Sequence, residues 1–290
     1  MKPQNRFSKI KITKHSGKRR IRSLDNLDKQ REEYPVLAEK IVDMSDIVLE
    51  VLDARFIKET RNKFIEKKIK EKNKRIIYVI NKIDLIKDKN ELFRKISFLI
   101  PRVLISCKNR IGISELRGKI KSLSKTIQTE KSNLKKVVVG VIGYPNTGKS
   151  SLINMVTGKN SLGVSPRAGF TKGIIKLNLT KDIVLLDSPG IIAQEKYSNT
   201  DSSLMIEHAK IGARDYSDVK NPELFVYELI KRYPKLIGDY YQINLNEINY
   251  DPELFLERLG KRKNLLKKGG LVNEDQVSRL IIKDWQEGKI

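Results

Sequence analysis

An apolar run followed by a glycine-rich octapeptide is the feature that most constrains this chain. Residues 137–142 read VVVGVI, residues 143–150 read GYPNTGKS, and the helical pattern SLINMVTG follows. A strand, a tight glycine loop and a helix in this order form the GxxxxGK[ST] loop, whose backbone N–H groups face an anion. Lys149 is then placed to bridge β- and γ-phosphate oxygens, and the Ser150 hydroxyl to bind Mg²⁺. The loop predicts a bound nucleotide but does not name its base.

Apolar β-branched runs alternate with charged helical patterns before residue 200. The runs fall at 47–52, 76–80, 103–106, 137–142, 173–179 and 183–186, and the helical patterns at about 59–72, 90–98, 112–124 and 149–157. Most runs are too uniformly apolar for a sheet that faces water on one side, so they predict buried strands of a mostly parallel sheet. Strands that alternate with helices predict an α/β fold.

The same pattern divides the chain into three parts. Residues 1–26 are basic, polar and aperiodic, which indicates a flexible arm that orders on binding. Residues 27–200 carry the α/β pattern. From 201 to 290 the strand signals stop, and helical patterns at 201–214, 222–232, 252–260 and 273–287 predict a C-terminal all-helical domain.

The sequence Asn81-Lys82-Ile83-Asp84 follows the apolar run RIIYVI, and so lies at the carboxyl edge of the predicted sheet, where α/β proteins bind ligands. The Asp84 carboxylate can accept hydrogen bonds from N1–H and the 2-amino group of guanine. Adenine has neither donor, so a site of this kind rejects it by about 10⁴-fold or more. Lys82 can lie along the base plane, and Asn81 is placed to tie this loop to the glycine loop. The alternative is a strand-end turn without a ligand.

Three further segments lie at or between strand ends. Asp187-Ser-Pro-Gly190 begins at the end of IVLLD and matches DxxG, so Asp187 would hold Mg²⁺ through water and the Gly190 N–H would meet the γ-phosphate. Thr171 lies between the glycine loop and this motif, where a threonine closes the Mg²⁺ shell only when the γ-phosphate is present. Ser106-Cys107-Lys108 ends another strand and suits a loop whose backbone N–H binds guanine O6.

Together these motifs resemble the five nucleotide-binding motifs of the Ras-like GTPases in an altered order. The order here is NKID, SCK, GYPNTGKS, Thr171 and DSPG, whereas the phosphate loop comes first in ordinary members. With SDIVLEVLDAR at 45–55, GYPNTGKSSLIN at 143–154 and KRKNLLKKGGLVNEDQVSRLIIKD at 261–284, the chain resembles the YlqF/YawG family of ribosome-assembly GTPases. The resemblance implies a circularly permuted Ras-like P-loop G domain that binds GTP or GDP with Mg²⁺.

The resemblance also implies a role for individual residues. The nucleotide-binding set would be Asn81, Lys82, Asp84, Ser106, Cys107, Lys108, Tyr144, Pro145, Asn146, Thr147, Gly148, Lys149, Ser150, Ser151, Thr171, Asp187 and Gly190. Lys149, Thr171 and Gly190 would act in catalysis. Ser150, Thr171 and Asp187 would hold Mg²⁺, the last through water.

Hydrolysis is expected to be slow in the isolated chain. Ile191 follows DxxG where Ras-like enzymes have the glutamine that orients water, so a partner, a cation or another part of the chain must supply the missing group. Asn146 matches the residue that coordinates potassium in related enzymes, which implies stimulation by K⁺. Bacterial relatives carry a histidine motif proposed to act in hydrolysis, and neither His15 nor His208 lies in it.

Charge indicates the class of partner. The net charge is +24, nine basic and no acidic residues lie in 1–22, and Lys261, Arg262, Lys263, Lys267 and Lys268 form a second basic group. This favours a nucleic acid over a membrane, because 1–22 has no amphipathic stripe. The resemblance implies rRNA in the large ribosomal subunit or its precursor. A GTPase for tRNA modification and an RNA-binding protein that uses GTP only as a ligand are the alternatives.

The remaining features predict a cytoplasmic monomer. No apolar run approaches the roughly 20 residues of a membrane-spanning helix, and no secretory signal is visible. Cys107 is the only cysteine, which fits a reducing compartment. Because residues after Gly190 lead directly into the helical domain, the nucleotide state is also expected to change the geometry between the two domains.

Overall fold

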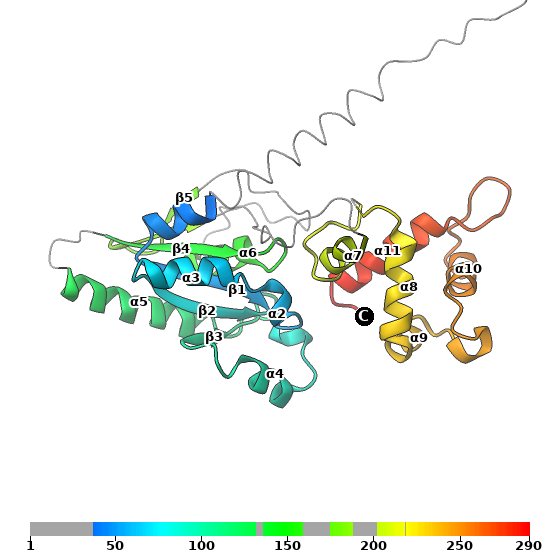
Figure 1. Cartoon of the computed structure of the whole chain (residues 1–290), viewed down its shortest axis with the longest axis horizontal. Helices are drawn as coiled ribbons and strands as arrows, with labels where there is room; N and C mark the ends of the chain where they lie inside the picture. The colour runs from blue at the N-terminus through cyan, green and yellow to red at the C-terminus, as the bar shows by residue number, and fades with distance from the viewer. Residues whose placement is uncertain (1–36, 132–135, 159–174, 188–201, 218) are drawn as a thin grey trace, which may run out of the picture.

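The computed structural model describes residues 37–131, 136–158, 175–187, 202–217 and 219–290. Figure 1 shows an α/β domain and a helical domain side by side along the longest axis. The predicted arm at 1–26 lies outside the described residues. Within the described ranges, no helix is long and apolar enough to cross a membrane.

Six strands form one sheet in the order β3-β2-β1-β4-β6-β5. Their bounds are β1 Ile47–Asp53, β2 Arg75–Asn81, β3 Arg102–Leu104, β4 Val137–Gly143, β5 Ile175–Asn178 and β6 Ile183–Asp187. All neighbouring strands are parallel except the antiparallel pair β5 and β6. The register places Asp53 beside Asn81 and Val51 beside Gly143, so the loops after β1, β2 and β4 meet at one edge of the sheet.

The order of strands in the sheet shows the permutation directly. Strands β1, β2 and β3 fill one half of the sheet, and β4, β6 and β5 fill the other. The glycine loop follows β4, which lies in the centre of the sheet although it comes fourth in the chain. The half that carries the NKID and SCK segments therefore comes before the half that carries the glycine loop, as the permuted order of the motifs predicts.

The apolar runs account for the burial of the central strands. Every residue of β1 is buried, as is all of β4 except Val138. One face of the sheet is covered by α5 Ile113–Glu130 and α6 Lys149–Thr157, and the other by residues 37–44, α3 Lys63–Glu71 and α4 Lys89–Ile96. The edge strand β5 is mostly exposed, because it has a neighbouring strand on one side only.

The second domain contains helices throughout its described part. These are α7 Ser202–Lys210, α8 Pro222–Arg232, α9 Pro234–Tyr241, the 3-10 helix η3 Leu245–Ile248, α10 Pro252–Arg262 and α11 Glu274–Gln286. Helix α11 packs against α7, α8 and α10 around a core that contains Phe225, Phe255 and Trp285. The sequence did not predict α9. Pro234 breaks the helical pattern directly after α8 and then begins a new helix at a position where its missing N–H costs nothing.

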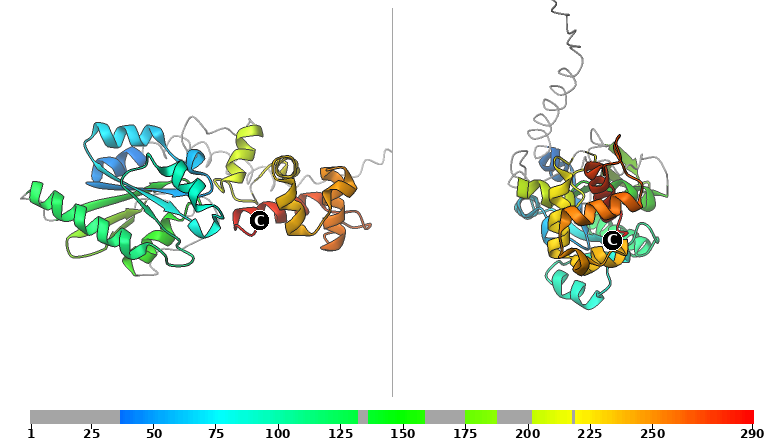
Figure 2. Two further views of the ribbon diagram at one scale, coloured as in Figure 1. Left: turned by 90° about the horizontal axis from the view of Figure 1, so that it is seen from below. Right: turned by 90° about the vertical axis from the view of Figure 1, so that its right-hand side faces the viewer.

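The two domains share a hydrophobic core. Phe56, just before the short helix α2 Ile57–Thr60, and Tyr144 of the glycine loop are both buried among apolar residues of the helical domain. The Phe56 and Trp285 rings lie 6.3 Å apart. Figure 2 shows the C-terminal end of the chain close to this junction. The helical domain is therefore packed beside the carboxyl edge of the sheet.

Candidate nucleotide site

The glycine loop connects β4 to α6 through backbone conformations that favour particular residues. Gly143, Asn146 and Gly148 have φ values of 151°, 58° and 98°. A Cβ atom at Gly148 would lie 2.3 Å from Nδ2 of Asn81, so glycine is required both by conformation and by the close approach of the neighbouring loop. The result is a tight turn that leads into the N-terminus of α6.

Lys149 is buried within this loop. Its Nζ donates a hydrogen bond to the Tyr144 carbonyl at 2.9 Å. Only 6% of the residue is exposed. Burial lowers the pKa of Lys149 to about 8, and the nearby Asp187 carboxylate acts in the opposite direction. The loop therefore encloses a cation at the position where the motif predicts phosphate contacts.

The other predicted loop residues divide between the cavity and the protein interior. Pro145 and Thr147 are buried, and Thr147 Oγ1 donates to the Tyr144 carbonyl at 2.9 Å. Ser151 lines the cavity described below. The Tyr144 side chain packs in the core of the helical domain, so only its backbone belongs to the loop.

Asn81 joins three loops. Its Nδ2 donates to the Thr147 carbonyl at 2.8 Å, and its Oδ1 accepts from the Cys107 N–H at 3.2 Å. The residue is 2% exposed, so both hydrogen bonds are shielded from water. The predicted tie between the base loop and the glycine loop is confirmed, and the third loop was not predicted to share it.

The Asp84 carboxylate is held by a neighbouring predicted segment. Ser106 Oγ donates to Asp84 Oδ1 at 2.5 Å, while the Asn109 N–H donates to Ser106 Oγ at 3.0 Å. The structure thus brings the NKID and SCK segments together, although they belong to different strands. Burial raises the pKa of the Cys107 thiol to about 11, which disfavours the thiolate form.

Asp53 carries an ion-pair network that sequence reasoning did not assign to the site. Arg55 lies 2.9 Å and Lys82 Nζ 2.7 Å from Asp53 Oδ2. Burial by itself would raise the pKa of Asp53, but the two cations outweigh it and hold the pKa at about 2. Lys82 has φ of 64°, so a left-handed turn directs its side chain to this carboxylate. The sequence signals were the position of Asp53 and Arg55 at a strand end and their place in SDIVLEVLDAR, and neither assigned them to the site.

Ser150 and Asp187 meet on the phosphate side of the sheet. Ser150 Oγ lies 3.4 Å from Asp187 Oδ2, and the register places Asp187 beside Val141 of the glycine-loop strand. A hydroxyl and a buried carboxylate are oxygen donors of the kind that Mg²⁺ prefers, so these residues fit the predicted ion. The other predicted residues of this part of the site, Thr171 and Gly190, lie outside the described residues.

A cavity of about 490 Å³ lies between these loops and the helical domain. From the α/β domain it is lined by predicted residues that include Asn81, Lys82, Asp84, Cys107, Lys108, Asn146, Gly148 and Ser151. From the helical domain it is lined by Gly212, Asp215, Tyr216, Lys283, Gln286 and Glu287. Sequence reasoning missed this second wall, because no local motif marks it.

Asn146 also contacts the helical domain. Its Nδ2 donates to the Gly212 carbonyl at 2.7 Å, so the residue predicted to bind K⁺ connects the glycine loop to the segment after α7. The amide nitrogen is committed to that contact, and the side-chain oxygen is the atom suited to a cation.

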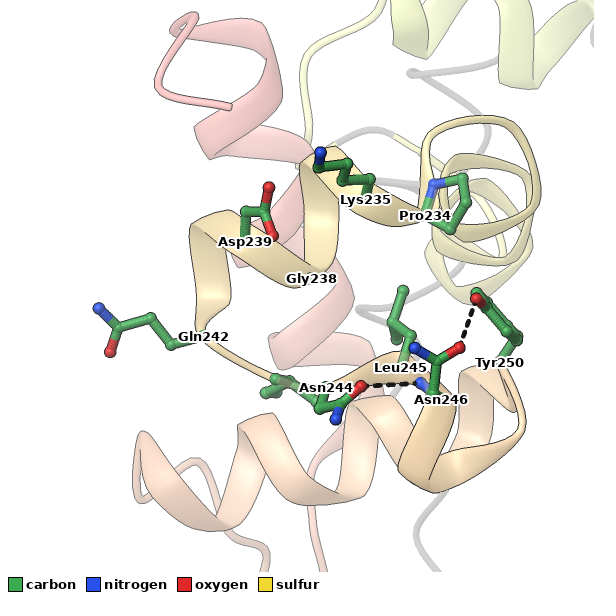
Figure 3. A pocket seen from close by; sticks show the side chains of 10 residues that line it. Pro234, Lys235, Gly238, Asp239, Gln242, Asn244, Leu245, Asn246 and Tyr250 are labelled. Atoms are coloured by element: carbon green, nitrogen blue, oxygen red, sulfur yellow. Dashed lines mark hydrogen bonds between the residues drawn. The ribbon is translucent and has the colours of Figure 1, made fainter.

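A second cavity, of about 700 Å³, lies within the helical domain between α9 and η3. Figure 3 shows Asn246 between Asn244 and Tyr250, whose hydroxyl donates to Asn246 Oδ1 at 2.6 Å. Lys235 and Asp239 are the charged residues of its lining. The charge of Lys235 is offset by Asp239 in this lining, so the cavity has no net positive charge for a di- or triphosphate, and the interdomain cavity is the better candidate for a nucleotide.

The comparison with protein families agrees with this geometry. Residues 138–231 match the model of a family described as 50S ribosome-binding GTPase. The matched segment begins in β4, includes the glycine loop, β5 and β6, and ends in α8. It therefore contains the phosphate side of the site, while the base loop lies upstream of it.

Several curated proteins are similar over most of this chain. A GTP-binding protein of Methanocaldococcus jannaschii is 37% identical over 88% of this chain and 65% of its own length. GTPase grn1 of Schizosaccharomyces pombe is 28% identical over 91% of this chain and 62% of its own length. Nucleolar GTP-binding protein 2 of Pneumocystis carinii is 32% identical over 87% of this chain and 51% of its own length. The chain thus spans between about half and two thirds of the length of these relatives.

Solved structures share the fold. GNP-bound YlqF from T. maritima has a TM-score of 0.53 to this chain, with 21% identity over 95% of both chains. GDP-bound YlqF has a TM-score of 0.52 and covers 86% of this chain and 93% of its own. At this identity the likeness concerns the fold, and it extends over both domains.

Proposed function

Because this chain belongs to the circularly permuted GTPases, we propose that it binds GTP and hydrolyses it to GDP and phosphate as a switch in assembly of the large ribosomal subunit. The observation that carries the nucleotide assignment is the arrangement around Asn81. One buried side chain holds the glycine loop, the base loop and the loop at Cys107 around a cavity of about 490 Å³.

The base end of the cavity suits guanine. Ser106 Oγ donates to the Asp84 carboxylate and fixes it. The carboxylate oxygens of Asp84 can accept hydrogen bonds from N1–H and the 2-amino group of the base. The Cys107 N–H is engaged by Asn81, so we assign the contact with guanine O6 to the N–H of Lys108, which lines the cavity. Adenine would leave the carboxylate without its donors, which is the physical basis of the proposed selectivity.

The phosphate end suits a nucleotide with Mg²⁺. We assign the phosphate oxygens to Lys149 and the loop N–H groups, and Mg²⁺ to Ser150, Thr171 and, through water, Asp187. Bound Mg²⁺ would neutralise charge on the phosphate oxygens. Gly190 would meet the γ-phosphate. Lys149 must then exchange its hydrogen bond with the Tyr144 carbonyl for phosphate oxygens, whose negative charge would favour its ammonium form.

Hydrolysis by the chain alone is proposed to be slow, since Ile191 offers no polar atom to orient water. We assign part of the missing stabilisation to K⁺ at Asn146 and the rest to the partner. The test compares GTP turnover in K⁺ and in Na⁺ at equal ionic strength. Equal rates in the two salts would remove the K⁺ site from the proposal.

The proposed partner is rRNA of the large subunit or its precursor, bound by the helical domain and by residues 1–26. Support comes from the end of α10 and the segment after it, where Lys261, Arg262, Lys263, Lys267 and Lys268 are all exposed. A cluster of this kind favours a polyanion through phosphate contacts. A monomer in the cytoplasm is part of the same proposal.

The experiment that tests the proposal measures GTP hydrolysis with and without purified large ribosomal subunits. We expect clear stimulation by the subunits. Turnover that the subunits leave unchanged would favour another RNA target, such as tRNA during its modification. A complete lack of turnover with retained GTP binding would favour an RNA-binding protein that uses GTP only as a ligand, as Ile191 in place of glutamine permits.

A further inference from the structure

The helical domain supplies one whole wall of the interdomain cavity. Tyr216 lies after α7, and Lys283 lies in the last turn of α11. The opposite wall runs from Asp84 and Lys108 at the base end to Gly148 and Ser151 at the phosphate end. A nucleotide bound by the motif residues would therefore lie between the two domains.

Direct contacts hold this second wall in place. Arg55 Nη1 donates to the Trp285 carbonyl at 3.2 Å, and Asn146 Nδ2 donates to the Gly212 carbonyl at 2.7 Å. A Cβ atom on Gly288 would lie 2.5 Å from Cδ1 of Leu85, so the end of the chain also packs closely on the base loop. The wall is thus attached at both the phosphate end and the base end of the cavity.

Lys283 is the residue of this wall whose chemistry suits a nucleotide. Its Nζ lies 5.7 Å from the centroid of the Tyr216 ring. Arg279 Nη1 donates a hydrogen bond to the Tyr216 carbonyl at 2.8 Å, which fixes the backbone of Tyr216. The described residues form fifteen ion pairs, and Lys283 takes part in none of them. Within the part of the chain that the structure describes, the half-buried Lys283 therefore has the Tyr216 ring beside its ammonium group and no ion-pair partner.

We propose that Lys283, positioned over Tyr216, binds the sugar–phosphate part of the guanine nucleotide directly from the helical domain. This inference rests on the proposed nucleotide site and extends it, because the nucleotide then joins the two domains. The orientation of the helical domain would depend on the bound nucleotide through this contact. The basic surface at the end of α10 belongs to the same domain, so nucleotide binding would also set its orientation.

The test measures the affinity of the full chain for a fluorescent GDP analogue by titration. Lys283→Ala is expected to weaken binding about tenfold, the loss typical of one charge-assisted hydrogen bond. Lys231→Ala is the matched control, because Lys231 is exposed on α8 of the same domain and lies away from the cavity. Lys283→Arg keeps the charge and is expected to retain most of the affinity, which separates a binding role from a loss of folding.

Hydrogen–deuterium exchange of the wild-type chain provides a second measurement. GDP is expected to slow exchange in residues 280–287 as well as in the glycine loop. Protection confined to the α/β domain, together with equal affinity of Lys283→Ala and wild type, would overturn the inference and leave the proposed function intact. A wild-type chain that binds no guanine nucleotide would overturn the proposed function and this inference with it.

Discussion

The middle of β1 and its carboxyl end each bury an acidic side chain, and the two behave in opposite ways. Glu50 lies in the middle of the strand, where burial and the neighbouring Glu66 raise its pKa well above the usual value. Asp53 lies at the end, where Lys82 and Arg55 reach it from loops and its pKa falls to about 2. The same strand thus buries a proton-binding acid in its interior and a fixed anion at its edge.

The difference shows how the sheet edge is prepared for charged ligands. Lys82 and Arg55 contact Asp53 directly from loops at the carboxyl edge, whereas at Glu50 the charge of Arg61 lowers the pKa less than burial and Glu66 raise it. Glu50 Oε1 accepts one backbone N–H, from Asn62 at 2.9 Å, and none of the ion pairs among the described residues includes Glu50. Charge at the edge can therefore be held in place, and charge in the interior is suppressed.

The largest expected effect concerns Asp84, the carboxylate proposed to bind guanine at this edge. Asp84→Asn is expected to weaken GDP binding by about 10³-fold or more, because an amide cannot accept from both guanine donors. Xanthosine diphosphate, which has a carbonyl in place of the 2-amino group, is expected to bind the variant better than GDP does. Calorimetric titration measures both affinities, and Asp182→Asn on the exposed β5–β6 turn serves as control. Unchanged GDP affinity would remove Asp84 from the site.

The next effect concerns the hydrogen bonds that hold the edge together. Asn81→Ala removes two buried hydrogen bonds and leaves the Thr147 carbonyl and Cys107 N–H without their partner, at a cost of about 3 kcal/mol in the free energy of unfolding. Urea unfolding measures this change. Asn90→Ala, at an exposed position of α4, is expected to change it by less than about 0.5 kcal/mol. If both variants proved equally stable, Asn81 would not be the link between the three loops.

Acid titration sharpens the comparison at Asp53. Its pKa is about 2 in the folded chain, below the 3.8 that is usual for an aspartate in water, so the unfolded chain binds the proton more readily. Asp53 therefore contributes about 2 kcal/mol of stability above pH 4, which is lost as the pH falls from about 4 to about 2. Asp53→Asn is expected to abolish this part of the pH dependence of the unfolding free energy. A variant with the full wild-type pH dependence would contradict the assignment.

Glu50 is expected to show the opposite sign with a smaller effect. Its folded pKa is raised, so the folded chain binds the proton more readily, and its contribution is fully present below pH 4.5 and lost as the pH rises. Glu50→Gln keeps the acceptor for the Asn62 N–H without an ionisable group. It is expected to be more stable than wild type by about 1 kcal/mol at pH 8, with a smaller difference at pH 4. A gain in stability that is larger at pH 4 than at pH 8 would contradict this, because Glu50 would then be charged and paired in the folded chain.

The parts of the site that follow from sequence are those set by local chain geometry. Asn81, Asp84 and Ser106 each lie at or just after a predicted strand, and parallel strands bring such positions to one edge whatever the rest of the fold does. The glycine loop was predictable for a similar reason, since its positive φ values at Gly143 and Gly148 require the residues that define the motif.

The rest could not be predicted because it depends on how the domains pack. Tyr216 and Lys283 reach the cavity only because Phe56 and Tyr144 are buried in the helical core, which no periodicity in the sequence reveals. In the sequence, Asp53 and Arg55 stand out only as strand-end residues within SDIVLEVLDAR, and nothing indicates that Lys82, which the motif places at the base, pairs with Asp53. Helix α9 was missed because Pro234 reads equally well as the end of one helix or the start of another.

The measurement that tests the account most directly is a calorimetric titration of the full chain with GDP and with ADP in the presence of Mg²⁺. The account predicts one GDP site per chain and a preference for GDP over ADP of about 10³-fold or more, since Asp84 finds both of its donors only on guanine. Equal affinity for the two nucleotides would contradict it, because the carboxyl edge of the sheet would then bind phosphates without reading the base.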